Sequence, residues 1–337
     1  MALPAVSDFA FERDLETHRR GLTGYCYRLL GSGSEAEDAV QEALTRAWKK
    51  SGDLQNREAL KGWLYRIASN VCFDMLDGSQ RRATPMDLGP ASHAGGALGA
   101  PLHESAWVLP IADAKVLPDG NDPAAIADAR ETLRLAFVAA LQHLPPKQRA
   151  VLVLREVLQW QATEVAELLD TTVASVNSAL QRARATLETL DLDRDGGAGG
   201  AVEAEQQDLL AKYVDAFEAY DITRLVGLLK DDAQFSMPPL PFWVVGPEDV
   251  HGFMLGAGAK CAGSKVLVTA ANGAPAVAIY NPAGSGDGFD PWAIVVMEFS
   301  AGGISGLHHF LDPGLFAQFG LPPRLEADGV GQAQETG

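Results

Sequence analysis

The sixteen-residue stretch TTVASVNSALQRARAT, residues 171–186, carries side chains that can read the edges of base pairs. Apolar residues recur along it every three or four positions, which predicts an amphipathic helix. The opposite face begins with small polar side chains and continues with arginines, which can hydrogen-bond to bases and phosphates in a DNA groove. The candidates for these contacts are Ser175, Asn177, Ser178, Gln181, Arg182 and Arg184. The buried stripe is expected to comprise Val173, Val176, Leu180, Ala183 and Leu187.

A turn and two shorter helices are expected to position this helix. Apolar residues between 152 and 169 define two further helix faces, and Asp170 to Thr172 form the turn that follows them. Thr172 is a natural N-cap, and Asp170 tolerates the backbone of such a turn better than most residues. The pattern predicts a helix-turn-helix. The alternative is an ordinary three-helix bundle with a polar outer face.

The distribution of charge bears on how tightly DNA could be held. The formal net charge is −17 for the whole chain but +1 for residues 130–190, which include the candidate helix. Residues 191–337 carry 7 Lys and Arg against 20 Asp and Glu. A self-sufficient DNA-binding domain usually presents a clear basic face. The weak positive charge therefore argues against tight DNA binding by residues 130–190 alone.

Helical periodicity also runs through most of residues 8–82. Gly31 to Ser34 interrupt it, and Ser34 is expected to cap the next helix, with Glu37 completing a capping box. Helices are expected over residues 35–50 and 57–82. This part of the chain has no net charge, because its 12 Lys and Arg balance its 12 Asp and Glu.

Two segments have the composition of linkers. Residues 83–129 are rich in Gly, Pro, Ala and Asp, which predicts a long flexible connection. Residues 191–201 form a shorter one. From residue 203 the pattern changes to a helix followed by successive strand-like runs, which predicts an α+β domain with a curved antiparallel sheet. The runs are residues 233–237, 264–272, 274–280, 292–300 and 303–310.

Composition argues against several classes of protein. No apolar run reaches the roughly 18 residues that span a bilayer, and the first twenty residues lack a signal-peptide core. The three cysteines are far apart and form no CxxC pair. Disulfide and zinc sites are therefore not expected, and a reducing cytoplasm fits best. We expect neither a metal nor a cofactor.

Two parts of the chain resemble one family, in the correct order. DAVQEALTRAW and LKGWLYRIASNVCFDMLDGSQRR resemble region two of the bacterial extracytoplasmic-function (ECF) sigma factors of RNA polymerase. LPPKQRAVLVLREVLQWQATEVAELL and TTVASVNSALQRARATL resemble region four. SMPPLPFW and HHFLDPGLFAQFGLP look like the SnoaL-like extension carried by some members. The fold class that follows is multidomain, with two all-α sigma modules and a cone-shaped α+β domain.

The resemblance implies domain bounds and contacts. Region two would occupy residues 8–82, the acidic linker 83–129, region four 130–190 and the SnoaL-like regulatory domain 203–325. Core RNA polymerase would bind Asp38, Gln41, Glu42 and Arg46. The −10 promoter element would contact Trp63, Arg66, Asn70, Phe73, Asp74, Arg81 and Arg82. Region four would read the −35 element with the six residues of the 171–186 helix. Solvated helix faces, and core packing for Trp63 or Phe73, are the alternatives.

The same resemblance implies an apolar cavity in the C-terminal domain. Its expected lining includes Phe235, Met237, Trp243, His251 and Trp292, with Asp232, His308 and His309 as further polar candidates. No motif fixes an acid–base pair, so a regulatory domain, with or without a small ligand, is favoured over an enzyme. No residue pattern identifies an anti-sigma factor or a membrane partner. The competing hypotheses are a stand-alone ligand-sensing helix-turn-helix regulator and a ketosteroid isomerase-like enzyme.

Overall fold

The computed structural model describes residues 6–327, except residues 55, 119–121, 191–199 and 285–286. The chain forms two compact units that interleave along the sequence. The helical unit comprises residues up to Arg82 together with Asp113–Leu192, and the α+β unit comprises Ala83–Ala112 together with the chain after Asp193. Each unit has its own buried core.

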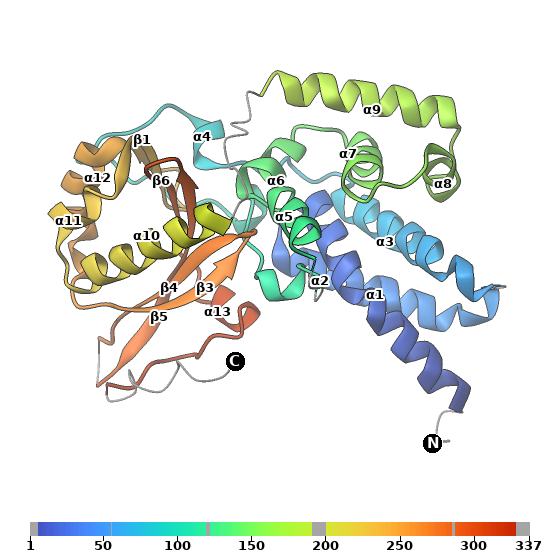
Figure 1. Ribbon diagram of the computed structural model, residues 1–337, viewed down its shortest axis with the longest axis horizontal. Coiled ribbons are helices and arrows are strands. Elements are labelled where there is room, and N and C mark those ends of the chain that lie inside the picture. Colours follow the sequence, from blue (N-terminus) through green and yellow to red (C-terminus); the bar gives the residue numbers. More distant parts are fainter. Residues whose placement is uncertain (1–5, 55, 119–121, 191–199, 285–286, 328–337) are drawn as a thin grey trace. The chain divides into compact units, whose positions relative to one another are not determined.

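Helices α1, α2 and α3 make up the first part of the helical unit (Figure 1). Their bounds are Val6–Leu30, Gly33–Lys49 and Leu60–Leu76. The cap of α2 lies two residues earlier than expected, because the Ser32 hydroxyl, not that of Ser34, accepts from the Glu35 N–H. Helix α3 ends at Leu76, before the expected position of 82, because Gly78 takes a left-handed backbone with φ of 71°.

Five further α-helices lie in the described part of the helical unit. They are α5 (Pro123–Glu131), α6 (Leu135–Leu141), α7 (Pro146–Leu152, continued by a π-helical turn over Val153–Val157), α8 (Ala162–Leu168) and α9 (Val173–Glu188). Helix α5 falls within the expected linker, where the Asp122 N-cap followed by Pro123 is a helix-start signal. The turn before α9 forms as expected, with Asp170 at φ 51° and Thr172 capping Ser175 at 3.1 Å.

Two buried guanidinium groups join the early helices to the later ones. Arg149 of α7 donates to the backbone oxygens of Leu29, Gln142 and Leu144 and to the side-chain oxygen of Gln142. Arg28 of α1 donates to Gly24 and to the backbone and hydroxyl oxygens of Thr132. Burial lowers the pKa of each arginine to about 10. Both groups therefore stay charged at neutral pH, and their acceptors make that charge tolerable inside the protein.

An aromatic contact lies where the two expected sigma regions pack together. The ring centroids of Tyr65 on α3 and Trp160, just before α8, are 5.1 Å apart. The Lys61 ammonium lies over the same Trp160 ring at 5.4 Å, within cation–π range. Regions two and four are thus packed against each other within one unit.

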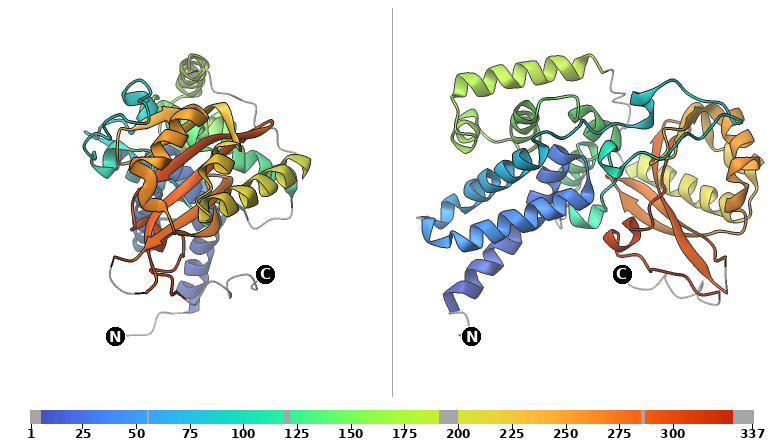
Figure 2. Two further views of the ribbon diagram at one scale, coloured as in Figure 1. Left: turned by 90° about the vertical axis from the view of Figure 1, so that its left-hand side faces the viewer. Right: turned by 180° about the vertical axis from the view of Figure 1, so that it is seen from behind.

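The α+β unit is a six-stranded sheet with α10, α11 and α12 over one face (Figure 2). Its helices are α10 (Gly200–Glu218), α11 (Ile222–Val226), α12 (Gly246–Leu255) and the short α13 (Leu315–Gln318). Its strands are β1 (Leu229–Ser236), β2 (Trp243–Val245), β3 (Lys265–Ala271), β4 (Ala274–Pro282), β5 (Phe289–Ser300) and β6 (Gly303–Phe310). The core forms where α10, α11 and α12 press apolar side chains onto the sheet.

The sheet order is β2-β1-β6-β5-β4-β3. All neighbouring pairs are antiparallel except β1 and β6, which run parallel with Phe235 opposite Leu307 and Ser236 opposite His308. Because side chains alternate across a strand, Phe235 and Ser236 point to opposite faces. His308 therefore lies on the face of Ser236, and His309 lies on the opposite face, beside Phe235.

Residues 83–112, which we call the strap, belong to the α+β unit. Ala83 and Trp107 form a parallel bridge, which brings the two ends of the strap together. Between them, backbone N–H groups of the strap donate to groups of the domain: Ser92 to the Trp243 carbonyl at 2.8 Å, Ala94 to the Asp249 carboxylate at 2.9 Å and Leu102 to the Pro239 carbonyl at 2.9 Å. The next residues attach to the helical unit, where Lys115 pairs with Glu37 at 2.7 Å. The expected flexible linker is therefore a docked segment over 83–118, held by contacts that composition does not encode.

We expect Arg149→Met to lower the free energy of unfolding of the helical unit by about 3 kcal/mol, because it leaves buried carbonyl acceptors without donors. Arg66→Met, at an exposed position of α3, should change it by less than about 0.5 kcal/mol. Urea unfolding followed by tryptophan fluorescence measures both variants. Equal midpoints would contradict the structural role assigned to Arg149.

Candidate nucleic-acid interface

Helix α9 presents the expected polar face to solvent. Ser175, Asn177, Gln181, Arg182 and Arg184 are exposed and Ser178 is half-buried. The Arg182 guanidinium bonds only to Ser178 on the same helix among the hydrogen bonds described, at 2.7 Å, which leaves its charge accessible. Arg184 instead pairs with Glu156 of the π-helical turn at 2.6 Å. Arg184 thus lies at the edge of the face and is partly neutralised.

The buried stripe of α9 is shorter than expected. Val176, Leu180 and Ala183 are buried, but Leu187 is half-buried and Val173 is 39% exposed. Val173 is the first residue of α9, and its side chain is not covered by the helices beneath. An exposed apolar side chain at the start of this face can contact a thymine methyl group. The sequence pattern placed Val173 in the core because it shares the three- and four-residue spacing.

Five of the seven expected −10 residues share one face of α3. At 100° per residue, Trp63, Arg66, Asn70, Phe73 and Asp74 fall within about 100° of arc. The two aromatic rings are half-buried and the three polar side chains are exposed. This face lies opposite Lys61 and Tyr65, which contact Trp160. Aromatic rings beside hydrogen-bonding groups suit stacking against unpaired bases.

The two arginines after α3, Arg81 and Arg82, differ in exposure, and only Arg81 is accessible as expected. Arg82 is only 7% exposed and its guanidinium is paired with the Glu35 carboxylate. Its assignment to phosphate contact is therefore corrected to a structural role, because a buried cation already has its counter-ion. Arg81 is exposed, and its Nη1 lies 2.6 Å from the His143 ring nitrogen Nδ1. The alternation of the extended chain after Leu76 turns one arginine inward and one outward.

The expected polymerase-binding residues lie along α2. Asp38, Gln41 and Glu42 are exposed, and Arg46 is half-buried between Glu42 at 2.6 Å and Asp74 at 3.5 Å. Arg46 therefore ties α2 to α3. Trp48, which the residue pattern did not single out, is 49% exposed at the end of the same helix. Its position at the edge of the apolar stripe is the signal that could have identified it, since large exposed aromatics often anchor protein interfaces.

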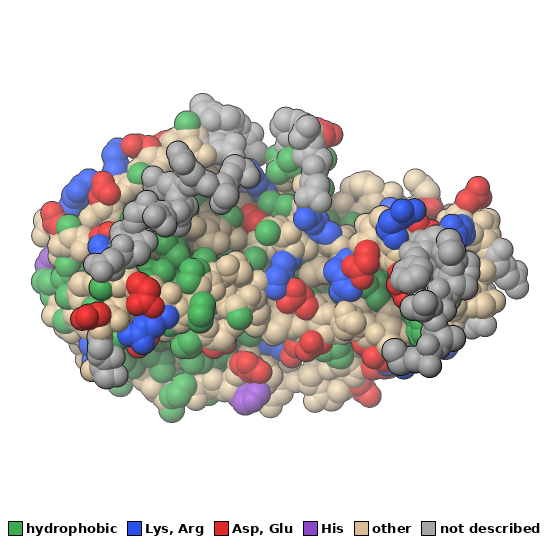
Figure 3. Space-filling view, turned by 90° about the horizontal axis from the view of Figure 1, so that it is seen from below, with side chains coloured by type: hydrophobic (Ala, Val, Ile, Leu, Met, Phe, Trp, Pro, Cys, Tyr) green, Lys and Arg blue, Asp and Glu red, His purple; other side chains and the backbone are tan. Residues whose placement is uncertain are grey.

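Charge is mixed on the surface. On the face in Figure 3, Lys and Arg side chains lie beside Asp and Glu rather than forming one continuous basic area. Ion pairs such as Arg19 with Glu16 at 2.6 Å also occur in the helical unit. The net charges of 0 for residues 1–82 and +1 for residues 130–190 indicate that phosphate attraction by the helical unit is modest.

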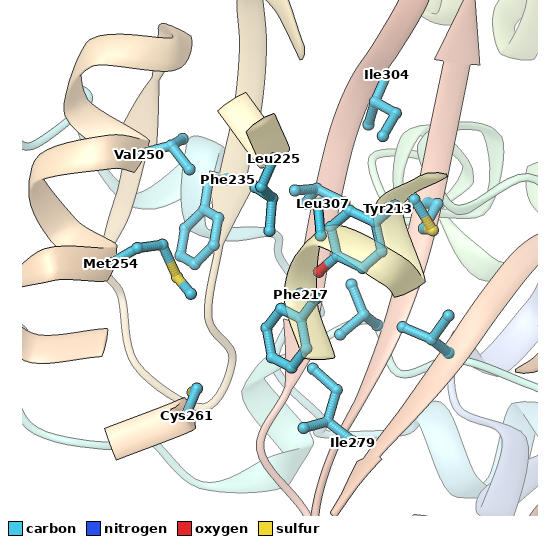
Figure 4. Close-up of a cluster of buried hydrophobic side chains, with 14 of the residues drawn as sticks. Tyr213, Phe217, Leu225, Phe235, Val250, Met254, Cys261, Ile279, Ile304 and Leu307 are labelled. Atoms are coloured by element: carbon cyan, nitrogen blue, oxygen red, sulfur yellow. The ribbon is translucent and has the colours of Figure 1, made fainter. Parts of the chain in front are cut away.

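The α+β unit encloses an apolar cavity of about 90 Å³. Its wall includes the expected Phe235, Met237 and Trp292. Figure 4 shows Phe217, Phe235, Met254 and Cys261, from four different elements, converging on this region. The described lining residues include no Asp or Glu. The polar residues among those that line the cavity include Lys260, Asn281 and His309.

Two expected lining residues lie elsewhere. Trp243 is not part of the wall and donates its indole N–H to the Gly89 carbonyl of the strap at 3.0 Å. His251 is half-buried on α12 and is also absent from the wall. The helix turns His251 away, because Val250, Phe253 and Met254 occupy its inward side. Asp232 is exposed on β1.

Ser236, His308 and Glu298 lie in a row outside the cavity wall, with one hydrogen bond between the first two and a longer contact between the last two. Ser236 Oγ lies 2.9 Å from His308 Nδ1, and His308 Nε2 lies 3.6 Å from the Glu298 carboxylate. This order of groups resembles the one that activates a serine nucleophile. However, Ser236 is 1% exposed and does not line the cavity, so no substrate reaches it there.

His309 is the titratable group that burial perturbs most clearly in the cavity wall. It is 3% exposed and its ring lies 4.4 Å from that of Phe235. The pKa of His309 is lowered to about 3, chiefly by burial and also by the nearby His308, whereas hydrogen bonds to the backbone of Leu307 and Ser236 act in the opposite direction. The imidazole is therefore neutral at physiological pH.

This shift predicts a loss of stability in acid. Because the folded pKa is about 3 and the unfolded value about 6.5, the unfolded chain binds the proton first as the pH falls below 6.5. Between pH 7 and pH 5 we expect His309 to remove about 2 kcal/mol of unfolding free energy. His309→Phe should lack this part of the pH dependence in urea unfolding. A variant and a parent with parallel pH profiles would contradict the prediction.

Comparison with known proteins places both sigma regions. Residues 15–82 match the family model of sigma-70 region 2, and residues 134–187 match that of sigma-70 region 4. The chain is 43% identical over 318 residues to the ECF RNA polymerase sigma factor SigG of Mycobacterium tuberculosis, covering 94% of this chain and 85% of SigG. It is 28% identical over 250 residues to SigJ of the same organism, covering 72% of each.

The crystal structure of Mycobacterium tuberculosis SigJ shares the fold. It superposes with a TM-score of 0.58 at 23% identity, covering 95% of this chain and all of that one. The α+β unit, which follows the two sigma regions, thus has the fold expected for the SnoaL-like extension. In the described part of the chain, no helix has the length and apolar character needed to cross a membrane. The match to SigG over nearly the whole chain, with both sigma regions in order, shows that the protein belongs to the ECF RNA polymerase sigma factors.

Proposed function

We propose that three helix faces divide the work of this sigma factor, and that the SnoaL-like domain modulates it. As an ECF sigma factor, the chain directs promoter-specific transcription initiation by core RNA polymerase and is not itself an enzyme. The exposed face of α2, with Asp38 and Trp48 along it, would bind the polymerase. The Trp63-to-Asp74 face of α3 would contact the −10 element, and the polar face of α9 would read the −35 element.

The observation that carries this assignment is the exposure of all three faces together with their weak net charge. Regions two and four have net charges of 0 and +1, and opposite charges are paired on their surfaces. A protein that held DNA alone would need more cations. A sigma factor bound to polymerase needs them less, since the assembly supplies affinity and α9 supplies selection. The same observation disfavours a stand-alone regulator.

The packed helical unit corresponds to a resting state. The two promoter elements are centred about 25 base pairs apart, or roughly 85 Å of B-DNA at about 3.4 Å per base pair. Helices α3 and α9 have 17 and 16 residues, so each is only about 25 Å long. Their regions touch through Tyr65 and Trp160. Both faces can engage one promoter only after region four leaves region two.

Through the strap, the SnoaL-like domain could control the separation of region four from region two. It joins region two to the rest of the chain and is hydrogen-bonded to the domain at Trp243, Pro239 and Asp249. While it is docked, the length of free chain between the two sigma regions is short. Modulation would thus act by holding or releasing the strap. The site of action would be the cytoplasm, where RNA polymerase works.

In-vitro transcription with core polymerase and genomic DNA of the source organism tests the function. The full chain should give transcripts with defined start sites. Gln181→Ala should reduce them about tenfold, since it removes a group placed to read bases. Glu188→Ala, exposed at the far end of α9, should leave them unchanged. Absence of defined starts with the full chain would refute the function, and equal yields from both variants would refute the assignment of α9.

We further expect Asp249→Ala to loosen the strap and to raise transcription several-fold. The Asp249 carboxylate accepts from the Ala94 N–H, whereas its neighbour Glu248 is exposed and serves as the matched control. Hydrogen exchange of residues 89–104 should speed up in Asp249→Ala and not in Glu248→Ala. Faster exchange without a gain of transcripts would show that the docked strap does not restrain initiation.

A further inference from the structure

Arg184 of α9 lies where a DNA backbone would be held, yet its charge is already paired. At 100° per residue, Arg184 lies about 20° around the helix from Asn177 and about 60° from Gln181, so the three side chains project to the same side. A cation at the flank of a groove-facing helix is placed to contact phosphate. The Arg184 guanidinium, however, donates to the Glu156 carboxylate at 2.6 Å, from 28 positions earlier in the chain.

The turn that carries Glu156 holds the backbone of this residue at several points. Glu156 belongs to the π-helical turn Val153–Val157. The Gln159 side-chain amide donates to the Glu156 carbonyl, and the Arg155 guanidinium donates to the Trp160 carbonyl. Turns of this kind are rare and often lie at functional sites. The carboxylate therefore meets its partner on α9 from a well-fixed position.

Arg182, two residues earlier on α9, shows how an unrestrained cation of the same helix differs. Among the described residues, its guanidinium forms no ion pair and bonds only to the Ser178 hydroxyl. The side chains of Arg184 and Glu156 are 55% and 41% exposed, so a phosphate group can reach the pair and compete for the guanidinium. That exchange would leave the Glu156 carboxylate unpaired beside the phosphates, where like charges repel. Arg184 thus has less to gain from DNA than Arg182 has.

We propose that Glu156 is a positioning residue that takes the place of a phosphate as the partner of Arg184, and so keeps the affinity of the free chain for DNA of any sequence low. Phosphate contacts carry no sequence information directly, so withholding one weakens binding to all sequences alike and leaves base preference unchanged. The free chain then depends on the contacts that polymerase adds before it binds DNA. The inference rests on the proposed role of α9 at the −35 element, and it assigns part of the weak DNA attraction to one ion pair.

Binding of a fluorescently labelled duplex of random sequence to the full chain, without polymerase, tests the proposal by anisotropy. In Glu156→Gln the affinity should rise about fivefold at about 50 mM salt, and the slope of log affinity against log salt should steepen by about 0.9, as for one added phosphate contact. Glu167→Gln is the matched control, because it removes one exposed carboxylate of α8 that forms no ion pair in the described part of the chain. An affinity of Glu156→Gln no greater than that of Glu167→Gln, or too weak to detect at low salt, would overturn the proposal.

Two further variants separate the release of Arg184 from a change in the turn itself. Adding Arg184→Gln to Glu156→Gln should remove both the gain in affinity and the steeper slope, whereas Glu156→Asp, which keeps the charge, should stay closer to the parent chain. A gain that survives Arg184→Gln would refute the role of Arg184. Transcription by Gln181→Ala with core polymerase reports on α9 independently. If that variant shows its expected loss while Glu156→Gln binds DNA as the control does, only the restraint assigned to Glu156 fails.

Discussion

The arrangement of the helical unit depends on the satisfaction of the buried Arg149 guanidinium. This group sits on α7 of region four, yet one of its acceptors is the Leu29 carbonyl of α1 in region two. Arg28 makes the reverse connection, from α1 to Thr132. Separating the regions would expose these cations and their acceptors to water, which can replace the lost bonds. The contact is thus strong in the free chain and reversible in an assembly.

Several features of the molecule restrain the separation of regions two and four. Buried polar contacts and the Tyr65–Trp160 pair both join the two regions. The strap supplies a second restraint, because its hydrogen bonds place the connection between the regions on the SnoaL-like domain. In the proposed function, the large negative charge of residues 191–337 would add a further bias, since an acidic domain on the same chain as α9 opposes the approach of DNA. Together these restraints would favour initiation within the polymerase assembly.

Local pattern predicted the elements well, and tertiary contacts account for what it missed. Expected runs such as 274–280 and 303–310 agree with β4 and β6, because alternation and turn residues are local signals. Composition made the strap look flexible, since its bonds to Asp249 and Trp243 come from residues more than 140 positions away. Likewise, spacing alone could not show that Arg82 pairs with Glu35. Nor could it show that His309, and not His251, faces the cavity.

Single-molecule energy transfer between regions two and four tests the central claim of separation. Dyes on Asp77→Cys and Glu167→Cys, both at exposed positions, would report the distance, since the native Cys26, Cys72 and Cys261 are buried. The free chain should show high transfer efficiency. In a complex with core polymerase and promoter DNA that yields transcripts, the efficiency should fall to a value expected for roughly 85 Å. Unchanged high efficiency in that active complex would contradict the account.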